Sequence, residues 1–530
     1  MRKRLPELNG LHFDAVIVGA GANGASAAQQ ITARGYKVLL VDKADFASGT
    51  SSRSSRLLAC GVQYLVPEPA FAGETTWRST LAKPFDYLRS LGAARQTMRC
   101  RTQLVRQSGN RLRPTTFFHP IYDDSPHPGW QVDLGFRVLG CFGSRDVPLD
   151  YRRLSAIDAR RQYPMTGRFG RQSQLRSVAV YQEYQYNWAE RICVDAALEA
   201  ERMGATVRNY TLANRIRHNG NRWEFELRDS LQDGLPARVT GEVFVNATGP
   251  WIDEVNALTG ACVKRRIAGI KGVNVLFKLP DDCENFGVEF FNSHGHHFFA
   301  MPWGRYHFFG PTTSAFEGSP DDVRVEESDL DYVIAEANYI FPSAKLTRSD
   351  VVYAWAGIRP RTHYEGQEAR RRSSVVHDLG SDGMPNAIAL TEGPIMLHRH
   401  AGARLADEVA RRVKPSREMQ PLSFVPLAFP DPMNSPLVTS EHPEVRVSDL
   451  RHAVTHEQAT SLIDLLFRRV KLGWNEDMGL KAAKEAARSV ADLLEWTEYD
   501  VENQVKQYST YVKEHFVASP IVAERAGGGR

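Results

Sequence analysis

Three glycines near the start of the chain have the spacing G-x-G-x-x-G, namely Gly19, Gly21 and Gly24. The first allows a tight turn, the second lets the backbone approach a pyrophosphate, and the third lets a helix pack on a strand. The N-terminus of that helix would face the phosphates with its positive dipole end. Asp42 follows 18 residues after Gly24, where an acidic side chain accepts hydrogen bonds from ribose hydroxyls. The spacing predicts a dinucleotide site, which includes Asn23 of the turn.

A loop rich in hydroxyl groups follows this acidic residue. It runs over 45–55 with the sequence D-F-A-S-G-T-S-S-R-S-S. Hydroxyl and backbone N–H groups suit a long, extended cofactor that carries phosphates. Together with the strand end at 247–249, the loop favours FAD over NAD. The residues predicted to contact this cofactor beyond the glycine turn are Asp42, Lys43, Thr50, Ser51, Ser52, Ala247, Thr248 and Gly249.

The elements that must position these groups are visible in the hydrophobic pattern. Short apolar runs over 13–18 and 37–41 flank a helical segment over 24–34. A strand, a helix and a second strand in this order imply a parallel sheet. A further buried strand is predicted over 242–247. Between 260 and 320, apolar and polar residues alternate, which is typical of antiparallel strands.

The last quarter of the chain changes character. A proline-rich stretch over 415–445 is predicted to be a linker, because proline interrupts regular elements. After it, apolar residues recur at helical spacing, which predicts a C-terminal helical domain over 446–520. The overall prediction is an α/β fold in which a Rossmann-like FAD-binding domain is intergrown with an antiparallel-sheet substrate domain. The FAD-binding domain is predicted over 1–90, 150–260 and 350–414, and the substrate domain over 91–149 and 261–349.

The composition is that of an ordinary globular protein, with 42% hydrophobic and 24% charged residues among 530. A formal net charge of +4 does not indicate nucleic acid binding, but it suits an anionic substrate or peripheral contact with an anionic membrane. Six scattered cysteines without a C-x-x-C pair favour a reducing compartment over a disulfide framework or a zinc site. We expect a cytoplasmic protein, or one peripheral on the inner membrane, without a metal site; a homodimer is left open.

Several longer motifs resemble the family of FAD-dependent glycerol-3-phosphate dehydrogenases. The segments 42–55 and 245–253 match its cofactor motifs, and the segment W-A-G-I-R-P over 355–360 matches its active-site arginine motif. The segment beginning D-L-L-F-R-R at Asp464 is similar to its C-terminal helical domain. The resemblance spans nearly the whole chain. It implies non-covalent FAD, a cofactor domain of the D-amino-acid-oxidase type, a substrate domain over the flavin, and quinone or oxygen as the electron acceptor.

The departures from the family pattern gather where substrate should bind. The family histidine and arginine after the serine loop are replaced by Ala59 and Gln63, a second family histidine by Asn274, and a family lysine by Pro394. Each charge-assisted hydrogen bond to phosphate is worth about 1.5–3 kcal/mol. Losing two cations would therefore weaken binding of glycerol 3-phosphate roughly a hundredfold or more. The arginines that could compensate are Arg56, Arg361 and Arg399.

Three residues are predicted to act on the substrate. Arg359 would hold an anionic group or a substrate oxygen, Tyr64 would donate a hydrogen bond, and His398 is the predicted base for the hydroxyl proton. By resemblance, a helix begins beside the flavin, and proline suits its first turn. Its N-terminus would stabilise negative charge on the reduced ring. The residues assigned to this helix start are Gly393, Pro394, Ile395 and Met396.

The function predicted from these residues is FAD-dependent oxidation of a hydroxyl group of a small polyol, sugar or polyol phosphate. One alternative is a true glycerol-3-phosphate dehydrogenase with a rearranged phosphate site. A second is an amine or amino-acid oxidase, for which Cys60 would allow a covalent flavin link. A third is an FAD-binding protein without catalysis, because both family histidines are lost. His294, His296 and His297 are assigned to a loop or to the substrate lining rather than to a metal site.

Overall fold

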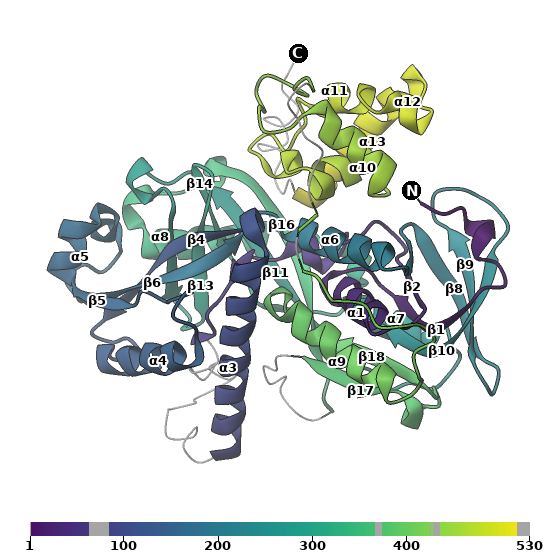
Figure 1. Ribbon diagram of the computed structural model, residues 1–530. Helices are drawn as coiled ribbons and strands as arrows, with labels where there is room; N and C mark the ends of the chain where they lie inside the picture. The colour runs from purple at the N-terminus through teal and green to yellow at the C-terminus, as the bar shows by residue number, and fades with distance from the viewer. Residues whose placement is uncertain (1, 63–83, 366–373, 425, 428–434, 517–530) are drawn as a thin grey trace.

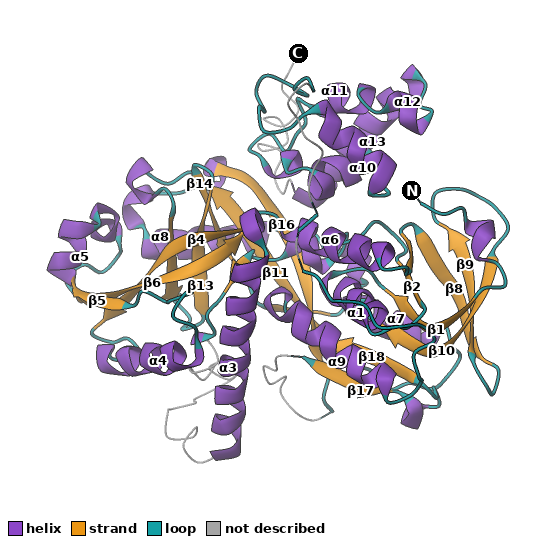
Figure 2. Cartoon of the chain, in the orientation of Figure 1, coloured by secondary structure: helices purple, strands orange, loops and turns teal. Residues whose placement is uncertain are grey.

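The computed structural model describes residues 2–62, 84–365, 374–424, 426–427 and 435–516. Two sheets lie side by side, and a group of C-terminal helices sits above the place where they meet (Figure 1). The strands and helices of each part are distinguished by colour in Figure 2. This arrangement confirms the predicted α/β fold with two intergrown sheets and a C-terminal helical part.

The first sheet has a parallel centre. β1 (His12–Val18) lies between β2 (Val38–Val41) and β10 (Ala237–Asn246). Beyond β2 the sheet continues with β7 (Thr206–Arg208), and beyond β10 it continues with β18 (Ala387–Thr391), both parallel to their neighbours. The predicted strands over 13–18, 37–41 and 242–247 are therefore confirmed, and their carboxyl ends meet at one edge of the sheet.

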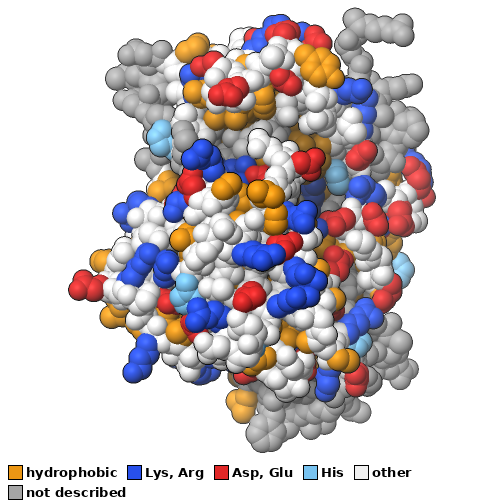
Figure 3. Space-filling model, turned by 90° about the vertical axis from the view of Figure 1, so that its right-hand side faces the viewer, with side chains coloured by type: hydrophobic (Ala, Val, Ile, Leu, Met, Phe, Trp, Pro, Cys, Tyr) orange, Lys and Arg blue, Asp and Glu red, His pale blue; other side chains and the backbone are white. Residues whose placement is uncertain are grey.

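Antiparallel strands complete this sheet at its margins. β17 (Val375–Asp378) pairs with β18. The hairpin of β8 (Thr211–His218) and β9 (Trp223–Asp229) pairs with the first half of β10. On the side of this sheet, the surface carries Lys and Arg side chains interspersed with Asp and Glu side chains (Figure 3).

α1 (Ala22–Ala33) is the helix that follows the glycine turn. It packs against α9 (His398–Ala410) and α6 (Ala189–Arg202), and every residue of α1 except Asn23 is buried. Small side chains allow this close packing, since a Cβ atom at Gly402 would lie 2.5 Å from the Ser26 hydroxyl oxygen. The helix predicted over 24–34 thus forms the centre of the cofactor half.

The second sheet is antiparallel except for the parallel pair β4–β12. Its order is β15-β11-β14-β13-β12-β4-β6-β3, with β16 paired to β11 and β5 to β6. The antiparallel strands predicted between 260 and 320 are confirmed. The ten strands are β3 (Leu57–Leu58), β4 (Leu112–Tyr122), β5 (Arg152–Ser155), β6 (Leu175–Tyr186), β11 (Ile267–Phe277), β12 (Phe286–Phe291), β13 (His297–Trp303), β14 (Tyr306–Gly310), β15 (Ser314–Phe316) and β16 (Val351–Thr362).

The sheet membership of some strands differs from the predicted domain ranges. β5 and β6 fall within 150–260, and β16 falls within 350–414, which were predicted for the FAD-binding domain. All three pair in the second sheet, because β6 lies along the length of β4 and β16 along the length of β11. The hydrophobic pattern of a strand identifies the strand but not the sheet that it joins.

Helices cover both faces of the second sheet. α8 (Glu327–Ile340) packs on one face, and α3 (Pro84–Gln107) and α4 (Gly129–Phe142) pack on the other. Two short helices, α5 (Ala156–Gln162) and α7 (Ile252–Ala257), lie at the ends of strands. No helix of the described residues is both long enough and apolar enough to span a lipid bilayer.

The C-terminal helices form a compact group against both sheets. A π-helical turn over Asp464–Arg469 contacts α6, and the last helix contacts β16. The described residues between 411 and 446 contain neither helix nor strand. Residues 425 and 428–434 of the predicted linker, and 517–520 of the predicted helical domain, lie outside the described residues. The helices of this part are α10 (Val447–His456), α11 (Ala483–Arg488), α12 (Ala491–Leu494) and α13 (Glu498–Phe516).

Candidate functional site

A cavity of about 360 Å³ lies at the carboxyl ends of the parallel strands. At one end it is lined by Gly19 after β1 and by Asp42 after β2, and it extends to Arg359 and Arg361 of β16. In open α/β sheets, ligands bind in the crevice outside the carboxyl ends of the strands. The cavity thus joins the cofactor half to the substrate half.

The glycine turn has no room for side chains. Gly19 has a φ of +103°, and a Cβ atom there would lie 2.7 Å from the carbonyl oxygen of Ala247. A Cβ atom at Gly24 would lie only 1.8 Å from the carbonyl oxygen of Gly19, and one at Gly21 would lie 3.1 Å from the Ser51 hydroxyl. Gly19 and Gly21 line the cavity, whereas Gly24 lies behind them where α1 meets the turn. The spacing therefore leaves bare backbone facing the cavity.

Asp42 and Ser51 connect the turn to the loop that follows β2. The Asp42 carboxylate accepts hydrogen bonds from the backbone N–H groups of Ala20 at 2.6 Å and Ala44 at 3.0 Å. Burial raises the pKa of Asp42 to about 6, although these N–H groups lower it. The Ser51 hydroxyl accepts a hydrogen bond from Ala22 N–H at 3.0 Å and so caps the N-terminus of α1.

The other predicted loop residues have different surroundings. Thr50 lines the cavity and donates a hydrogen bond to the carbonyl oxygen of Ile358 at 2.7 Å. Lys43 also lines the cavity, while its ammonium group pairs with Asp321 at 2.8 Å. Ser52 is buried behind the loop and hydrogen-bonds the carbonyl oxygen of Ala47. We read Ser52 as a residue that fixes the loop from behind.

The second predicted cofactor contact lies after β18. Gly393 has a φ of +64°, and its carbonyl oxygen accepts a hydrogen bond from the Asn23 amide at 2.8 Å. A Cβ atom at Gly393 would lie 2.5 Å from that amide nitrogen. Pro394 stands immediately before a short helical turn, Ile395–Leu397, that leads into α9. The N-terminus of this turn faces the cavity, which Gly393, Pro394, Ile395 and Met396 all line.

The end of β10 closes the same part of the cavity. Ala247, Thr248 and Gly249, which were predicted to contact the cofactor, all line it. The Thr248 backbone N–H and hydroxyl both donate hydrogen bonds to the Asn246 side-chain oxygen, at 3.3 and 2.6 Å. These bonds hold the chain in the sharp bend that brings Gly249, with its φ of +62°, beside the cavity.

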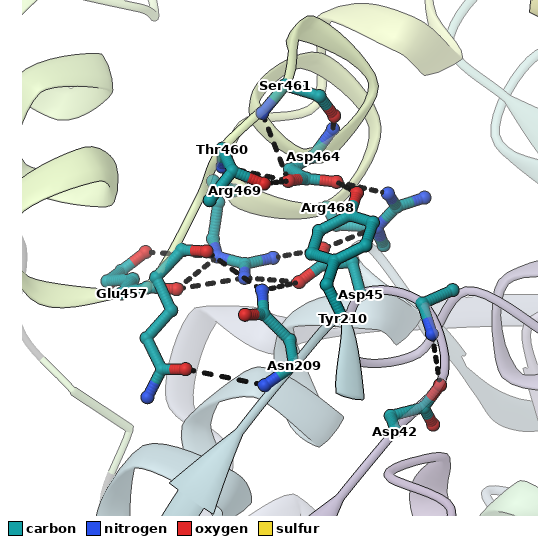
Figure 4. A network of polar contacts seen from close by, with 12 residues as sticks. Asp42, Asp45, Asn209, Tyr210, Glu457, Thr460, Ser461, Asp464, Arg468 and Arg469 are labelled. Atoms are coloured by element: carbon teal, nitrogen blue, oxygen red, sulfur yellow. Dashed lines mark hydrogen bonds and ion pairs between the residues drawn. The ribbon is translucent and has the colours of Figure 1, made fainter. Parts of the chain in front are cut away.

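Asp45 anchors the cofactor loop to the C-terminal helices (Figure 4). Its carboxylate accepts hydrogen bonds from Arg468 at 2.6 Å and from Arg469 at 2.8 and 2.9 Å. The Asn209 amide donates a further bond at 2.9 Å. Burial alone would raise the pKa of Asp45, but the charges of Arg469 and Arg468 lower it to about 2. The carboxylate is therefore ionised and fully paired.

This network continues into the first sheet's helix layer. The backbone carbonyl oxygen of Glu457 accepts hydrogen bonds from Arg469, and its carboxylate binds Arg191 of α6 at 2.6 and 2.7 Å. All of these side chains are buried. The C-terminal helices thus hold the loop that carries Thr50 and Ser51.

Two arginines of β16 mark the substrate end of the cavity. Residues two apart on a strand point to the same face, so Arg359 and Arg361 project together. The Arg359 guanidinium donates hydrogen bonds to the Thr312 carbonyl oxygen at 2.7 Å and to the Thr313 hydroxyl at 3.0 Å. Arg361 is the one proposed compensating cation that lines the cavity within the described residues. Asn274 also lines it.

The other two compensating arginines face elsewhere. Arg56 pairs with Glu190 at 2.7 Å and stacks on Trp474 of the C-terminal part at 3.9 Å. Arg399 donates to the Gln107 side-chain oxygen at 2.7 Å and lines a small separate cavity. Neither lines the main cavity.

His398 is not brought to the main cavity either. Its Nδ1 donates a hydrogen bond to the Ile395 carbonyl oxygen at 2.6 Å, and the ring is buried beside Arg399. Burial and the neighbouring arginine lower the pKa of His398 to about 3, so the imidazole is neutral. Tyr64 lies outside the described residues. Cys60 is buried and does not line the cavity.

Trp251 and Glu392 are among the cavity residues that reasoning from the sequence missed. Trp251 follows the predicted strand end, and its ring lies 2.9 Å from where a Cβ atom of Gly49 would be. Glu392 precedes Gly393 and has a φ of +62°. Its place before a predicted helix start was the available signal for Glu392, because a carboxylate so close to the turn must lie near the cavity.

These features together fit FAD. The bare glycine turn and two helix N-termini suit phosphate and ring carbonyl oxygens, and the Asp42 carboxylate suits ribose hydroxyls. The lining of the cavity also includes both Asp42 after β2 and Arg359 of β16, so it reaches from the cofactor half to the substrate half. A dinucleotide with a further ring system needs a site of this form.

Comparison with known proteins agrees with this interpretation. The family model described as the C-terminal domain of alpha-glycerophosphate oxidase matches residues 430–501. A glycerol-3-phosphate dehydrogenase of Synechocystis is 25% identical and covers 97% of this chain and 99% of its own.

Solved structures show the same fold. The glycerol-3-phosphate dehydrogenase of Bacillus halodurans in complex with FAD superposes with a TM-score of 0.72 at 20% identity, covering 96% of both chains. Glycine oxidase of Geobacillus kaustophilus has a TM-score of 0.51 at 18% identity and covers 79% of this chain and all of its own. The family model described as FAD dependent oxidoreductase matches residues 14–392, and the chain therefore belongs to that family.

Proposed function

We propose that this FAD-dependent oxidoreductase oxidises a hydroxyl group of a small polyol phosphate. The observation that carries the proposal is the pair Arg359 and Arg361, which line the same end of the FAD cavity. Two guanidinium groups on one strand face suit a phosphate, which they can bind through paired hydrogen bonds. The relatives named glycerol-3-phosphate dehydrogenase support a substrate of this class.

Three described residues would bind different parts of the substrate. Arg359, held by Thr312 and Thr313, keeps a fixed guanidinium plane toward the cavity. Arg361 adds a second positive charge, and the Asn274 amide can hydrogen-bond a substrate hydroxyl. Bound FAD supplies the hydride-accepting ring. Tyr64 remains the predicted donor to the substrate.

A substrate comparison tests the proposal. FAD-loaded protein should be assayed with a dye acceptor against glycerol 3-phosphate and glycerol in parallel. If two charge-assisted hydrogen bonds distinguish them, kcat/KM should favour the phosphate by roughly a hundredfold or more. Equal activity with both compounds would contradict it. If neither compound nor any related polyol reduces the flavin while FAD stays bound, the non-catalytic alternative is supported instead.

An amino-acid oxidase is the second candidate. The same two arginines would bind a carboxylate, and glycine oxidase shares the fold. The C-terminal helices favour the first candidate, because residues 430–501 match the domain of alpha-glycerophosphate oxidase. Anaerobic mixing with glycine or proline separates the two, since only an amino-acid oxidase would bleach the flavin absorbance.

The electron acceptor is proposed to be quinone or oxygen. A positively charged chain with peripheral access to an anionic membrane would reach a quinone pool without a membrane-spanning helix. Reoxidation of the substrate-reduced protein should be followed with a soluble quinone and with dissolved oxygen. Faster reoxidation by the quinone would identify it as the acceptor.

A further inference from the structure

A second cavity, of about 140 Å³, lies between the second sheet and α4. It shares no lining residue with the FAD cavity among the residues that the structure describes. Phe291 of β12 is one of its lining residues, and three imidazoles lie close to that ring. The centroids of His119, His127 and His297 lie 5.6, 5.9 and 4.7 Å from that of Phe291. The cavity thus combines an apolar surface with several polar groups.

Glu289 fixes the orientation of two of these histidines. Its carboxylate accepts a hydrogen bond from His297 Nδ1 at 2.8 Å and another from the Tyr181 hydroxyl. Its backbone carbonyl oxygen accepts one from His119 Nδ1 at 2.9 Å. Burial alone would raise the pKa of Glu289, but the hydrogen bond and charge of His297 lower it. Since each Nδ1 donates, the other ring nitrogen of each histidine is left for a ligand.

The remaining ring nitrogens suit hydroxyl groups. His297 Nε2 is buried and has no hydrogen-bond partner among the residues that the structure describes. Burial lowers the pKa of His119, so this imidazole is neutral and its Nε2 is an acceptor. Burial also lowers the pKa of His127, whose Nδ1 lies 3.3 Å from the Gln131 side-chain oxygen. No Lys or Arg is among the described residues that line this cavity.

The charge balance of the cavity determines what it can bind. An anion would find no Lys or Arg among the described lining residues, and the Glu289 carboxylate would repel it. A buried ring nitrogen without a partner costs free energy unless a ligand or water hydrogen-bonds to it. A small uncharged polyhydroxy compound meets these requirements, because each hydroxyl group can donate to or accept from an imidazole nitrogen. Its C–H groups can pack on Phe291. The volume has room for several water molecules or a ligand of similar size.

A row of paired residues runs across the sheet from this cavity to the FAD cavity. Glu289 pairs with Phe299, and Phe299 pairs with Gly310. A Cβ atom at Gly310 would lie 2.8 Å from the Asn274 side-chain oxygen, which lines the FAD cavity. Paired residues point to the same face, and neighbouring strands are about 4.8 Å apart, so Glu289 lies roughly 14 Å from Asn274. The two cavities therefore share a face of the sheet but are separate sites.

We propose that the cavity around Phe291 is a second ligand site, which binds a small uncharged polyol through His119 and His297. The proposal does not depend on which compound the FAD site oxidises. It gives His297, the histidine of the segment 294–297 that lines this cavity, a role in ligand binding. The neutral polyols expected here differ from the anionic compounds that suit Arg359 and Arg361.

Ligand-detected NMR on the full FAD-loaded chain tests this site, with erythritol as the probe under argon. The variants are His297→Asn and His119→Asn, because the asparagine amide can still donate to Glu289 while the distal ring nitrogen is removed. Loss of one hydrogen bond should weaken erythritol binding about three- to tenfold in each variant. His294→Gln is the matched control, since its side chain is 64% exposed and does not line the cavity.

Three results would overturn the proposal. Erythritol binding could be unchanged in both asparagine variants while their FAD absorbance and thermal midpoint match the unsubstituted protein. Inorganic phosphate could displace erythritol, which would show an anion site. Arg361→Met could abolish the signal, which would place erythritol in the FAD cavity. Displacement only by neutral polyols, with the signal retained in Arg361→Met and weakened in the two asparagine variants, supports it.

Discussion

The two ends of the FAD cavity are built in different ways. At the cofactor end, backbone contacts decide which residues are allowed, as at Gly19 and Gly24, where a Cβ atom would meet backbone carbonyl oxygens at 2.7 and 1.8 Å. At the substrate end, the described groups are the side chains of Arg359 and Arg361 on one strand. A backbone cradle tolerates little change, whereas a side-chain pocket can change its ligand through a few substitutions. This difference explains how a chain can keep its cofactor motifs while its substrate residues diverge.

The Asp45 network gives the largest expected effect at the cofactor end. Asp45→Asn would leave Arg468 and Arg469 buried without the carboxylate that they share. Breaking a buried ion pair in this way costs about 3–5 kcal/mol. We expect a much lower unfolding midpoint, together with faster loss of FAD on gel filtration, because the loop that carries Ser51 loses its anchor.

An exposed ion pair provides the control for Asp45. Lys481 and Glu441 pair at 3.3 Å with side chains 67% and 59% exposed. Glu441→Gln should change stability by only about 0–1 kcal/mol and leave FAD bound. If Asp45→Asn were as mild as this control, the C-terminal helices would not be holding the cofactor loop.

Gly24→Ala tests the backbone cradle directly. The new methyl group would meet the Gly19 carbonyl oxygen, and backbone cannot rotate away, so the cost should be near the upper end of overpacking, about 3 kcal/mol. The purified variant should retain little FAD, as judged by its absorbance relative to protein. Gly140→Ala in α4 is the control, because nothing lies within 4 Å of the added atom and alanine favours helix. Full FAD content in Gly24→Ala would refute the close packing.

Arg361→Met tests the substrate end and should spare the cofactor. Removing one charge-assisted hydrogen bond of about 1.5–3 kcal/mol should raise KM for glycerol 3-phosphate roughly 10- to 100-fold, with FAD content unchanged. Arg399→Met is the matched control, since that arginine lines a separate cavity. An equal rise in KM for both variants would show that Arg361 contributes no more to substrate binding than Arg399 does.

The same contrast determines what could be predicted from the sequence. The glycine turn and Asp42 were identified because local spacing specifies backbone geometry, whereas the turn at Gly393 was identified from the family resemblance. All of them line or support the cavity. Substrate residues come from strands far apart in the chain, and no local pattern shows which way they face. His398 was therefore placed beside the substrate from its neighbours in sequence, whereas its ring points into a different cavity. Local pattern also does not show which sheet a strand joins, since β16 follows one sheet's segments and precedes the other's in sequence, and it pairs with β11.

The smallest predicted effect concerns His398 and separates a structural role from a catalytic one. Its folded-state pKa of about 3 lies below the unfolded value of about 6.5, so between these values the unfolded chain binds the extra proton. The histidine's contribution to stability is therefore complete above pH 6.5 and is lost as the pH falls toward 3, by at most about 1.4 kcal/mol per pH unit. His398→Asn can keep the donor to Ile395 but cannot titrate. Thermal midpoints of the two proteins should diverge as the pH falls from 7 to 5, with the unsubstituted protein losing more. If the two thermal midpoints instead changed in parallel with pH, and the pH profile of kcat changed in the variant, His398 would be the base that acts on the substrate.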